Sequence, residues 1–389
     1  METLIATALA AGDAESAAHS LARDVRAQLG GVEPVLLVAF ASTKQPLGEI
    51  ARHLRAAFPR ATLLSASTAG EFTEATDAKG HAAVFALAGD YRVFAGMGSG
   101  LAKDVEGAVR GAVGDLPVEV AEHPHRTAIL LLDPIAGMSE EATLIAASYL
   151  GEGVRLAGGA AGDDLAMKQT FVGCGERVAS DAVVAAVIFS KQPLGLGVCH
   201  GHEPLSRPLR VTKASGATVF EIEGRPAWQV WEEETRASAA ARGLQPEADI
   251  GAFLLRYEAG LSSGDAYKIR APLSRGADGS ISFACGIPEG TVIRITQSDP
   301  AHQIDSARTA AKRARAQLGD GKVAGALVFD CICRNLILGP DFVRAAVAIA
   351  DELGGVRLAG FETYGEIALD AGDMSGFHNT TSVVLAFPR

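Results

Sequence analysis

The hexapeptide Gly-Val-Arg-Leu-Ala-Gly occurs twice in the chain, at residues 153–158 and again at residues 355–360. Each copy follows a stretch with helical periodicity and leads into a loop that carries acidic residues. A looser third copy covers residues 61–71. Such repetition constrains the fold more than any other feature of the sequence, because it requires one local structure to be built several times.

Each repeat has an apolar run, a helical pattern, a second apolar run with a Gly-containing loop, and a last strand. This succession predicts a β-α-β-β unit over residues 35–87, 128–189 and 326–387. Ser139 and Asp341 stand where a helix N-cap is expected. The crossover is right-handed, so the loops after both of its strands meet at one edge of a sheet. Ligands of open α/β sheets bind at that edge, and we expect the site there.

Residues 200–320 lack the repeat. Alternating apolar and polar residues between Gly and Pro turns predict half-exposed antiparallel strands there, interrupted by helical patterns at residues 227–242 and 301–318. The predicted fold is therefore α/β, with repeated β-α-β-β units forming two mixed-sheet halves. We expect these halves to be residues 31–225 and 226–389, with the β-rich stretch in the second half.

Composition narrows the class of protein. With 389 residues, 48% of them hydrophobic and 21% charged, the chain can bury the cores of two or three domains. A net charge of −11 and a pI of about 5.4 argue against partners that are nucleic acids or anionic membranes. The N-terminus carries Glu2 where a secretory signal has bases, and no apolar stretch is long enough to span a bilayer, so we expect a soluble, cytoplasmic protein.

Ordered motifs in the first half resemble the FIST N domain. They are Ser-Thr-Ala-Gly-Glu at 67–71, Gly-Gly-Ala-Ala-Gly-Asp-Asp at 158–164, Val-Thr-Lys-Ala at 211–214 and Gly-Arg-Pro-Ala at 224–227. Motifs in the second half are similar to the FIST C domain. They are Phe-Asp-Cys-Ile-Cys-Arg at 329–334, Ala-Gly-Phe-Glu-Thr-Tyr-Gly-Glu at 359–366 and Phe-His-Asn-Thr-Thr at 377–381. The resemblance covers about residues 31–389.

The resemblance implies an intracellular sensory module that binds a small ligand such as an amino acid. It also implies that the signal passes to a kinase or a cyclic-nucleotide enzyme as a separate partner protein; a homodimer is compatible with the sequence. A branch of the family, the NosP proteins, binds haem and senses nitric oxide. The chain departs from the common pattern at one place, where His200-Gly201 is followed by His202 instead of an aromatic residue.

The loops at the expected sheet edge supply the candidate ligand-binding residues, which are Ser67, Thr68, Gly70, Glu71, Asp163, Arg334, Thr363 and Glu366. Glu71 and Glu366 end equivalent loops. Each either holds a ligand ammonium or binds backbone N–H groups of its own turn. The backbone and hydroxyls at residues 67–70 either face an anion or form the turn.

Arg334 follows a buried strand in an expected loop at residues 331–334. Its guanidinium either binds a carboxylate or phosphate of the ligand or is a solvated loop residue. Asp163 and Asp164 resemble a hard-cation site but lack a third acidic ligand at fixed spacing. We therefore expect Asp163 to close a turn and to accept one hydrogen bond from a ligand.

Haem iron, if bound, requires a soft donor, and three histidines are candidates. His200 and His202 would point to the same side of an extended strand, and His378 lies before the last strand. The alternative for each is a structural hydrogen-bonding role, and no C-x-x-C-H attachment motif is present.

Enzyme motifs are not supported by their context. No Gly-x-Ser-x-Gly or P-loop pattern stands between an expected strand and an expected helix, as such motifs require, and we find no convincing pair of nucleophile and base. We expect a non-enzymatic small-ligand sensor without its own output domain, with a haem-based nitric oxide sensor as the alternative. From another class, an enzyme acting on a small anionic metabolite is the competing hypothesis.

Overall fold

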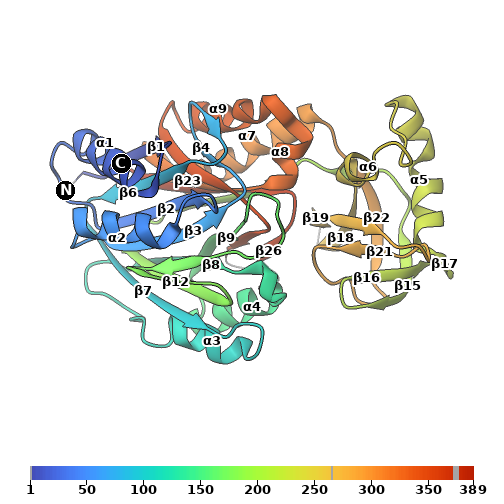
Figure 1. The fold of residues 1–389 in the computed structure, drawn as a ribbon, viewed down its shortest axis with the longest axis horizontal. Helices are drawn as coiled ribbons and strands as arrows, with labels where there is room; N and C mark the ends of the chain where they lie inside the picture. Colours follow the sequence, from blue (N-terminus) through green and yellow to red (C-terminus); the bar gives the residue numbers. More distant parts are fainter. Residues whose placement is uncertain (1, 264–265, 371–375) are drawn as a thin grey trace.

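The computed structural model describes residues 2–263, 266–370 and 376–389. They form two bodies (Figure 1). In the larger one, called here the three-unit body, three six-stranded sheets surround an apolar core. The smaller, residues 203–297, is the inserted domain, which interrupts the third unit. The chain ends lie together on the side away from it, where Arg389 Nε is 2.6 Å from Glu2 Oε1.

The first unit begins the chain and carries two outer helices. Its elements are β1 (Leu4–Ala10), α1 (Ala14–Gln28), β2 (Leu36–Ser42), α2 (Leu47–Ala57), β3 (Thr62–Thr68), β4 (Glu71–Thr73), β5 (Asp77–Ala78) and β6 (Ala82–Ala88). The second unit repeats this order with β7 (Tyr91–Ser99), α3 (Val105–Val113), β8 (His125–Leu132), η1 (Pro134–Ala136), α4 (Ser139–Leu150), β9 (Arg155–Ala160), β10 (Val172–Cys174), β11 (Arg177–Ala179) and β12 (Ala182–Ser190).

The third unit has the same order, with the inserted domain between its first strand and its first helix. Its elements are β13 (Gly195–His200), α7 (Pro300–Ala316), β23 (Val323–Cys331), α8 (Ile332–Leu338), η2 (Gly339–Asp341), α9 (Phe342–Glu352), β24 (Arg357–Thr363), β25 (Glu366–Leu369), β26 (Phe377–His378) and β27 (Thr381–Pro388). In all three units the two central strands are parallel and the flanking strands antiparallel.

The three units exchange one strand each around a closed ring. Strand β4 of the first unit pairs with β24 of the third, β25 of the third pairs with β9 of the second, and β10 of the second pairs with β3 of the first. Because every unit completes the sheet of another, none of the three sheets is built from one continuous stretch of chain.

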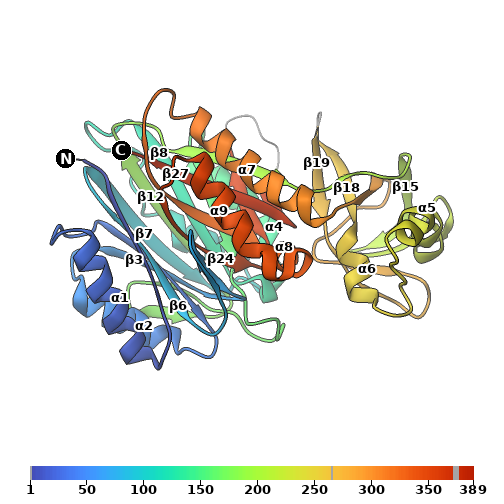
Figure 2. The same cartoon turned by 90° about the horizontal axis from the view of Figure 1, so that it is seen from above.

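The sheets are buried on both faces, which explains the continuous apolar runs of the sequence. On β2, Leu36, Val38 and Phe40 point into the common core, while Leu37 and Ala39 point outward to helices. Figure 2 shows α1 and α2 on the outer face of one sheet and α7 and α9 on the outer face of another. In the centre, the rings of the core residues Phe40 and Phe361 stack with centroids 4.6 Å apart.

The inserted domain is a nine-stranded sheet with two helices. Its elements are β14 (Glu203–Pro204), β15 (Leu209–Ser215), β16 (Thr218–Ile222), β17 (Arg225–Pro226), α5 (Ala227–Ala241), α6 (Ile250–Arg256), β18 (Tyr257–Ser263), β19 (Ala266–Arg270), β20 (Pro272–Arg275), β21 (Ile281–Phe283) and β22 (Val292–Gln297). It has an apolar core of its own, which includes Trp231, Phe253 and Phe283.

The repeated units, the mixed sheets and the β-rich stretch of the sequence analysis are confirmed. Two local expectations are wrong. Of residues 331–334, expected as a loop, Cys331 ends β23 and the other three begin α8. Ser139 is the first residue of α4 and not its N-cap, whereas Asp341 is the N-cap residue of α9 but forms no side-chain cap hydrogen bond. The expected division at residue 225 stays a prediction; β13, which precedes it, pairs with β27 at the end of the chain. Within the described residues, no helix combines the length and apolar character needed to cross a membrane.

Candidate functional site

A cavity of about 400 Å³ lies between the three-unit body and the inserted domain. The body contributes loops that follow the central strands, and the inserted domain contributes α6 and the start of β20. The lining residues are Pro134, Ile135, Leu165, Met167, Gly251, Leu254, Leu255, Ala271, Pro272, Leu273, Ala284, Cys331, Ile332, Cys333, Leu336, Tyr364 and Asn379. The cavity therefore opens at the carboxyl ends of the strands, where α/β sheets bind ligands.

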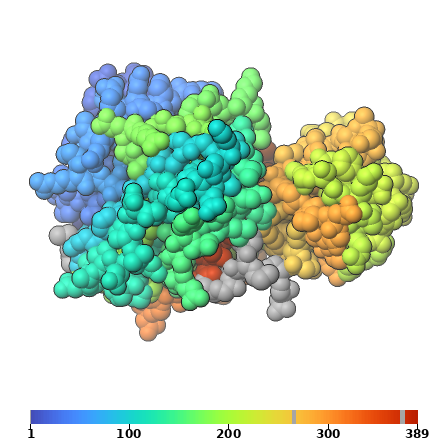
Figure 3. All heavy atoms as spheres, turned by 90° about the horizontal axis from the view of Figure 1, so that it is seen from below, coloured from blue at the N-terminus to red at the C-terminus, as the bar shows by residue number. Residues whose placement is uncertain are grey.

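The rim of this cavity is apolar and open to solvent. Ile135, Leu165, Met167, Leu273 and Leu336 are each between 41% and 53% exposed. Figure 3 shows the inserted domain, in yellow and orange, as a separate lobe against the larger body. Water solvates apolar side chains poorly, so exposed apolar side chains that surround a cavity often indicate a binding site.

Asp163 holds the loop that forms one wall of the cavity, although its own side chain does not line the cavity. Its carboxylate accepts hydrogen bonds from the backbone N–H of Met167, Lys168 and Gln169 at 2.6–3.0 Å and from the Tyr364 hydroxyl at 2.6 Å. Burial raises the pKa of Asp163, but these hydrogen bonds outweigh burial and leave the pKa below its usual value. The carboxylate thus closes its turn, one of the roles expected from the sequence.

The loop that Asp163 holds is conformationally strained. Asp164, Leu165 and Met167 all have positive φ, at 53°, 65° and 51°. A bulky residue in the left-handed region costs free energy and persists where surrounding contacts enforce it. Here the Tyr364 hydroxyl also accepts a hydrogen bond from the N–H of Leu165 at 2.8 Å. The strain places the side chains of Leu165 and Met167 on the cavity rim.

Glu71 and Glu366 occupy equivalent positions in the first and third units, and neither lines the cavity. Thr68 Oγ1 donates to Glu71 and Thr363 Oγ1 donates to Glu366, so each threonine bonds the glutamate three residues on. The other carboxyl oxygen accepts a backbone N–H, from His81 at 3.2 Å or from Thr381 at 3.1 Å. Both side chains are fully buried, and each joins its turn to the beginning of the last strand of the same unit, because His81 directly precedes β6 and Thr381 is the first residue of β27.

Burial dominates the protonation of these two glutamates. It raises the pKa of Glu71 to about 8, against hydrogen bonds from Thr68 and His81 that lower it. Burial also raises the pKa of Glu366 well above its usual value. Both carboxyls are therefore held mostly neutral near pH 7, which suits a structural hydrogen-bonding role better than attraction of a ligand ammonium.

Ser67 and Gly70 join the units to one another. Ser67 Oγ accepts the N–H of Phe171 at 2.8 Å, and Phe171 directly precedes β10, the strand that the second unit lends to the first sheet. A Cβ at Gly70 would lie 2.6 Å from the carboxyl carbon of Glu362, so the position has no room for a side chain. Both residues therefore serve the strand exchange, and neither is part of the cavity wall.

Arg334 does not lie in a loop, which corrects the expectation from the sequence. It is in α8, fully buried. Its Nε donates to Asp330 Oδ1 at 2.7 Å, Nη1 donates to Gln303 Oε1 at 2.5 Å and to Ser306 Oγ at 2.7 Å, and Nη2 donates to the Gln303 carbonyl at 3.0 Å. The guanidinium therefore binds groups inside the protein and does not line the cavity.

The same network reaches the two chain segments that enter and leave the inserted domain. Gln303 Nε2 donates to Ser298 Oγ at 2.7 Å, and Ser298 Oγ donates to the carbonyl of Gly201 at 2.6 Å. Arg334 sits on α8, whose residues Ile332 and Leu336 line the cavity. A buried chain of hydrogen bonds thus connects the cavity wall to both of these segments, residues 201–202 and 298–299, which are called here the hinge.

A second buried polar cluster was not expected from the sequence. Glu362 is fully buried, accepts Asn335 Nδ2 at 2.5 Å and has one carboxyl oxygen without a hydrogen-bond partner among the described residues. Asn335 Nδ2 also approaches Asp77 Oδ2 at 3.2 Å. Burial, followed by the charge of Asp77, raises the pKa of Glu362 to about 10. Glu362 lies within the motif at residues 359–366, next to Thr363, and this position was the signal in the sequence that could have pointed to it.

The three candidate haem ligands all take part in internal contacts near the hinge or the last strands. His200 Nε2 lies 2.9 Å from the Tyr267 carbonyl, and His378 Nε2 lies 3.2 Å from the Ala368 carbonyl. His202 is buried, with Nδ1 3.3 Å from Thr296 Oγ1 and Nε2 3.7 Å from Glu258 Oε2.

Burial lowers the pKa of His200 and His378 to about 4 and that of His202 well below its usual value. None of the three lines the cavity between the bodies. Each of these three imidazoles therefore makes an internal contact, and none of them lies in the wall of this cavity.

Comparison with known families agrees with this architecture. The profile of the FIST N domain matches residues 35–225 and that of the FIST C domain matches residues 227–369. The chain belongs to the FIST family. FIST domains are sensory, ligand-binding domains. In this FIST protein the change from one profile to the other falls inside the inserted domain, between β17 and α5.

Curated relatives are similar over part of their length. An uncharacterized protein of Mycobacterium tuberculosis is 33% identical over 199 residues, 49% of this chain and 50% of its own. One of Mycobacterium bovis is 31% identical over 53% of this chain and 54% of its own. One of Methanocaldococcus jannaschii is 25% identical over 59% and 48%. The FIST chain thus spans about half the length of the curated relatives it matches.

A solved structure, cyanuric acid hydrolase from A. caulinodans, aligns over 99% of both chains with a TM-score of 0.29 and 11% identity. Similarity at that level carries no argument about this protein.

Proposed function

We propose that this FIST protein is a small-molecule sensor whose ligand occupies the cavity between the three-unit body and the inserted domain. The observation that carries the proposal is the cavity itself. Its volume of about 400 Å³ is in the range of small-molecule sites, and both bodies contribute to its wall. A ligand bound there would contact both bodies at once, so its binding would favour one relative placement of the two over others.

The lining favours a largely apolar ligand. Among the described residues that line the cavity none is charged, and the polar side chains are Tyr364, Asn379 and the thiols of Cys331 and Cys333. The Tyr364 hydroxyl is used by Asp163 and the N–H of Leu165. A free amino acid or a polyanion would lose its hydration without an ionic partner, which costs several kcal/mol. An aromatic or aliphatic small molecule with few polar groups fits the site better.

The signal would leave the cavity through α8. Movement of Ile332 and Leu336 on ligand binding also moves Arg334, since all three lie on this short helix. Arg334 is linked through Gln303 and Ser298 to Gly201, so the hinge segments respond with it. A hinge that adopts two positions is an established kind of switch. We propose that a separate sensor kinase or cyclic-nucleotide enzyme reads the position of the inserted domain.

The test fills the cavity from its rim. Leu336→Trp adds bulk on α8 at a position 44% exposed, and Leu144→Trp, at a position 45% exposed on α4 outside the lining, is the matched control. The neutral apolar dye Nile red serves as the probe in a fluorescence titration, and native mass spectrometry detects any co-purified ligand.

We expect the dye and any co-purified ligand to be lost from Leu336→Trp and retained in Leu144→Trp, with the dissociation constant raised more than about tenfold, or about 1.4 kcal/mol. Equal binding by both variants would move the ligand site elsewhere.

Haem and catalysis are less well supported. A haem-based nitric oxide sensor needs a free axial imidazole, and those of His200, His202 and His378 are engaged or enclosed. A hemin titration with a saturable Soret shift that His202→Ala abolishes would revive it. An enzyme acting on an anionic metabolite would need a charged group in the cavity, and the part of the lining that the structure describes supplies none.

A further inference from the structure

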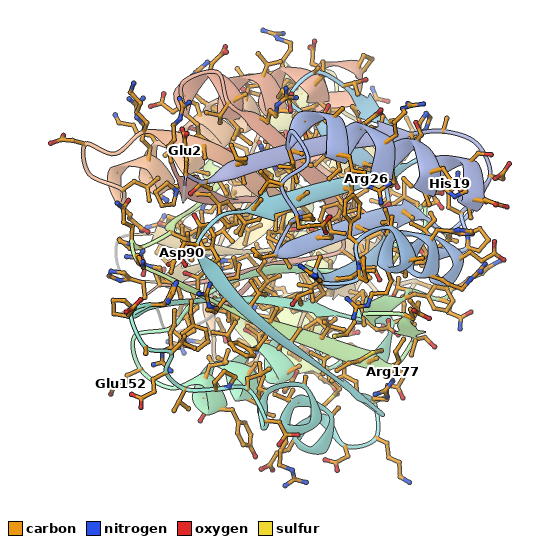
Figure 4. The ribbon with its side chains drawn as sticks, turned by 90° about the vertical axis from the view of Figure 1, so that its left-hand side faces the viewer. Glu2, His19, Arg26, Asp90, Glu152 and Arg177 are labelled. Carbon is orange, nitrogen blue, oxygen red and sulfur yellow. The ribbon has the colours of Figure 1, made fainter. Side chains whose placement is uncertain are left out.

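Three side chains with metal-binding atoms lie together on the first unit. Figure 4, which views the molecule from the side away from the inserted domain, labels one of them, His19 on α1. Glu15 and His19 are four residues apart on α1 and so share one face of the helix. His53 reaches the same place from α2. One ligand atom of each lies within 4.8 Å of the others. The two imidazole rings meet edge to face, with centroids 5.4 Å apart.

The backbone that carries these residues is held firmly. Helices α1 and α2 pack side by side on the first sheet, with Leu21, Ala22, Ile50 and Leu54 buried in one core cluster. The side chains of Glu15 and His19 are exposed, and that of His53 is half-buried. Their helices therefore fix where the donors start, while the side chains keep the freedom to turn toward a common centre.

A hollow of about 450 Å³ adjoins the two histidines. It is lined by His19, Ala22, Arg23, Arg26, His53, Ala56 and Ala57. The hollow leaves space beside the imidazoles for a bound ion and the water that would complete its coordination.

We propose that Glu15, His19 and His53 bind a divalent transition-metal ion of the zinc type and thereby link α1 to α2. Two imidazoles and a carboxylate are a donor set that zinc accepts at bond lengths of about 2.0–2.2 Å. A tetrahedral arrangement would bring the donor atoms to roughly 3.3 Å from one another, which the exposed side chains can reach by rotation. Imidazole donors favour zinc, copper or nickel over calcium and magnesium, which bind through oxygen.

Nearby arginines are positively charged and therefore affect how strongly the cluster binds a cation. Arg26 is directed at the carbonyl of Ala57 at 2.8 Å, and Arg23 is paired with Asp24 at 2.9 Å. Arg52 opposes the ion more directly, because its Nη2 is 3.5 Å from His53 Nε2. Arg52 is exposed and can turn away. Removing its charge should therefore tighten metal binding, which a merely structural role of His53 would not predict.

The experiment titrates the purified full chain with Zn²⁺ in competition with a chromogenic chelator, and with Co²⁺ as a spectroscopic probe. His19→Ala and His53→Ala are compared with His125→Ala, a histidine on β8 outside the cluster. Circular dichroism checks that each variant folds.

We expect binding of one ion, weakened more than about tenfold in both cluster variants and unchanged in His125→Ala, since even residues around a ligand set change affinity by that factor. Arg52→Ala should bind more tightly. Zn²⁺ should raise the unfolding temperature of the wild type and leave that of His19→Ala in place, because an ion that binds the folded state stabilises it by mass action.

Three results would overturn the proposal. One is the absence of Zn²⁺ binding by the wild-type chain, and another is equal affinity of all the histidine variants. The third is a strong near-ultraviolet band of the Co²⁺ complex, which would show thiolate ligation by cysteines instead of this cluster.

Discussion

Replacing Arg334 by methionine should strongly lower the free energy of unfolding of this protein. The guanidinium is fully buried and bonded to Asp330, Gln303 and Ser306. Methionine keeps much of the volume but leaves the Asp330 carboxylate buried without its cation. Removing one partner of a buried ion pair costs about 3–5 kcal/mol. We expect a loss of that size in the free energy of unfolding, measured by urea denaturation at pH 7.

Arg344→Met is the matched control. Arg344 is also paired with an aspartate on its own chain segment, Asp341, at 3.5 Å, but both side chains are more than half exposed. Exposed pairs of this kind contribute about 0–1 kcal/mol. If Arg334→Met cost no more than Arg344→Met, the account of Arg334 as the centre of a buried network would be refuted.

The pH dependence provides a second check on the same variant. Burial raises the pKa of Asp330, and the charge of Arg334 lowers it. Without Arg334, the effect of burial is opposed less, and the folded-state pKa rises further above the unfolded value. A carboxyl with a raised pKa destabilises the folded state increasingly as the pH rises from the unfolded pKa toward the folded one. The loss caused by Arg334→Met should therefore be smaller at pH 4.5 than at pH 8.

Two further substitutions test other contacts. The pKa of Glu71 is raised to about 8, so its contribution to stability falls as the pH rises from about 4.5 to about 8, by at most about 1.4 kcal/mol per pH unit. Glu71→Gln should remove this contribution to the pH dependence of the unfolding free energy, measured by urea denaturation across pH 5–9. An unchanged pH dependence would show that Glu71 titrates normally. Gly70→Ala should destabilise the fold by about 1–3 kcal/mol because its Cβ would meet the Glu362 carboxyl. Gly48→Ala, at a position with open space in α2, should stabilise the fold by about 0.5–1 kcal/mol. If thermal unfolding showed a stability change of the same sign for both variants, the tight packing at Gly70 would be contradicted.

The repeated unit could be predicted because each of its elements is encoded locally. Apolar runs such as residues 35–40 indicate buried strands, and β2 lies there at Leu36–Ser42. The helical pattern near Ser139 forms α4, Ser139–Leu150. The edge that carries the cavity also follows from local information, since the βαβ connection fixes which strand ends lie together. For these features, periodicity and chain connectivity suffice.

Contacts between distant segments could not be predicted in the same way. Nothing local in Glu71–Thr73 shows that β4 pairs with a strand of the third unit. The cavity wall includes Leu254 and Leu273 of the inserted domain, which lie far from the motifs in sequence. Arg334 looked like a loop residue because its partner Gln303 is remote in sequence, and only the packing of α7 beside α8 brings the two together.

The crystal structure of the protein with its co-purified ligand tests the central claim most directly. The account predicts electron density for a mostly apolar molecule between α6 and α8, in contact with Leu254, Leu336 and Leu273, and no such density in Leu336→Trp. Density for the ligand at another site, with the cavity between the two bodies filled by ordered water alone, would contradict it.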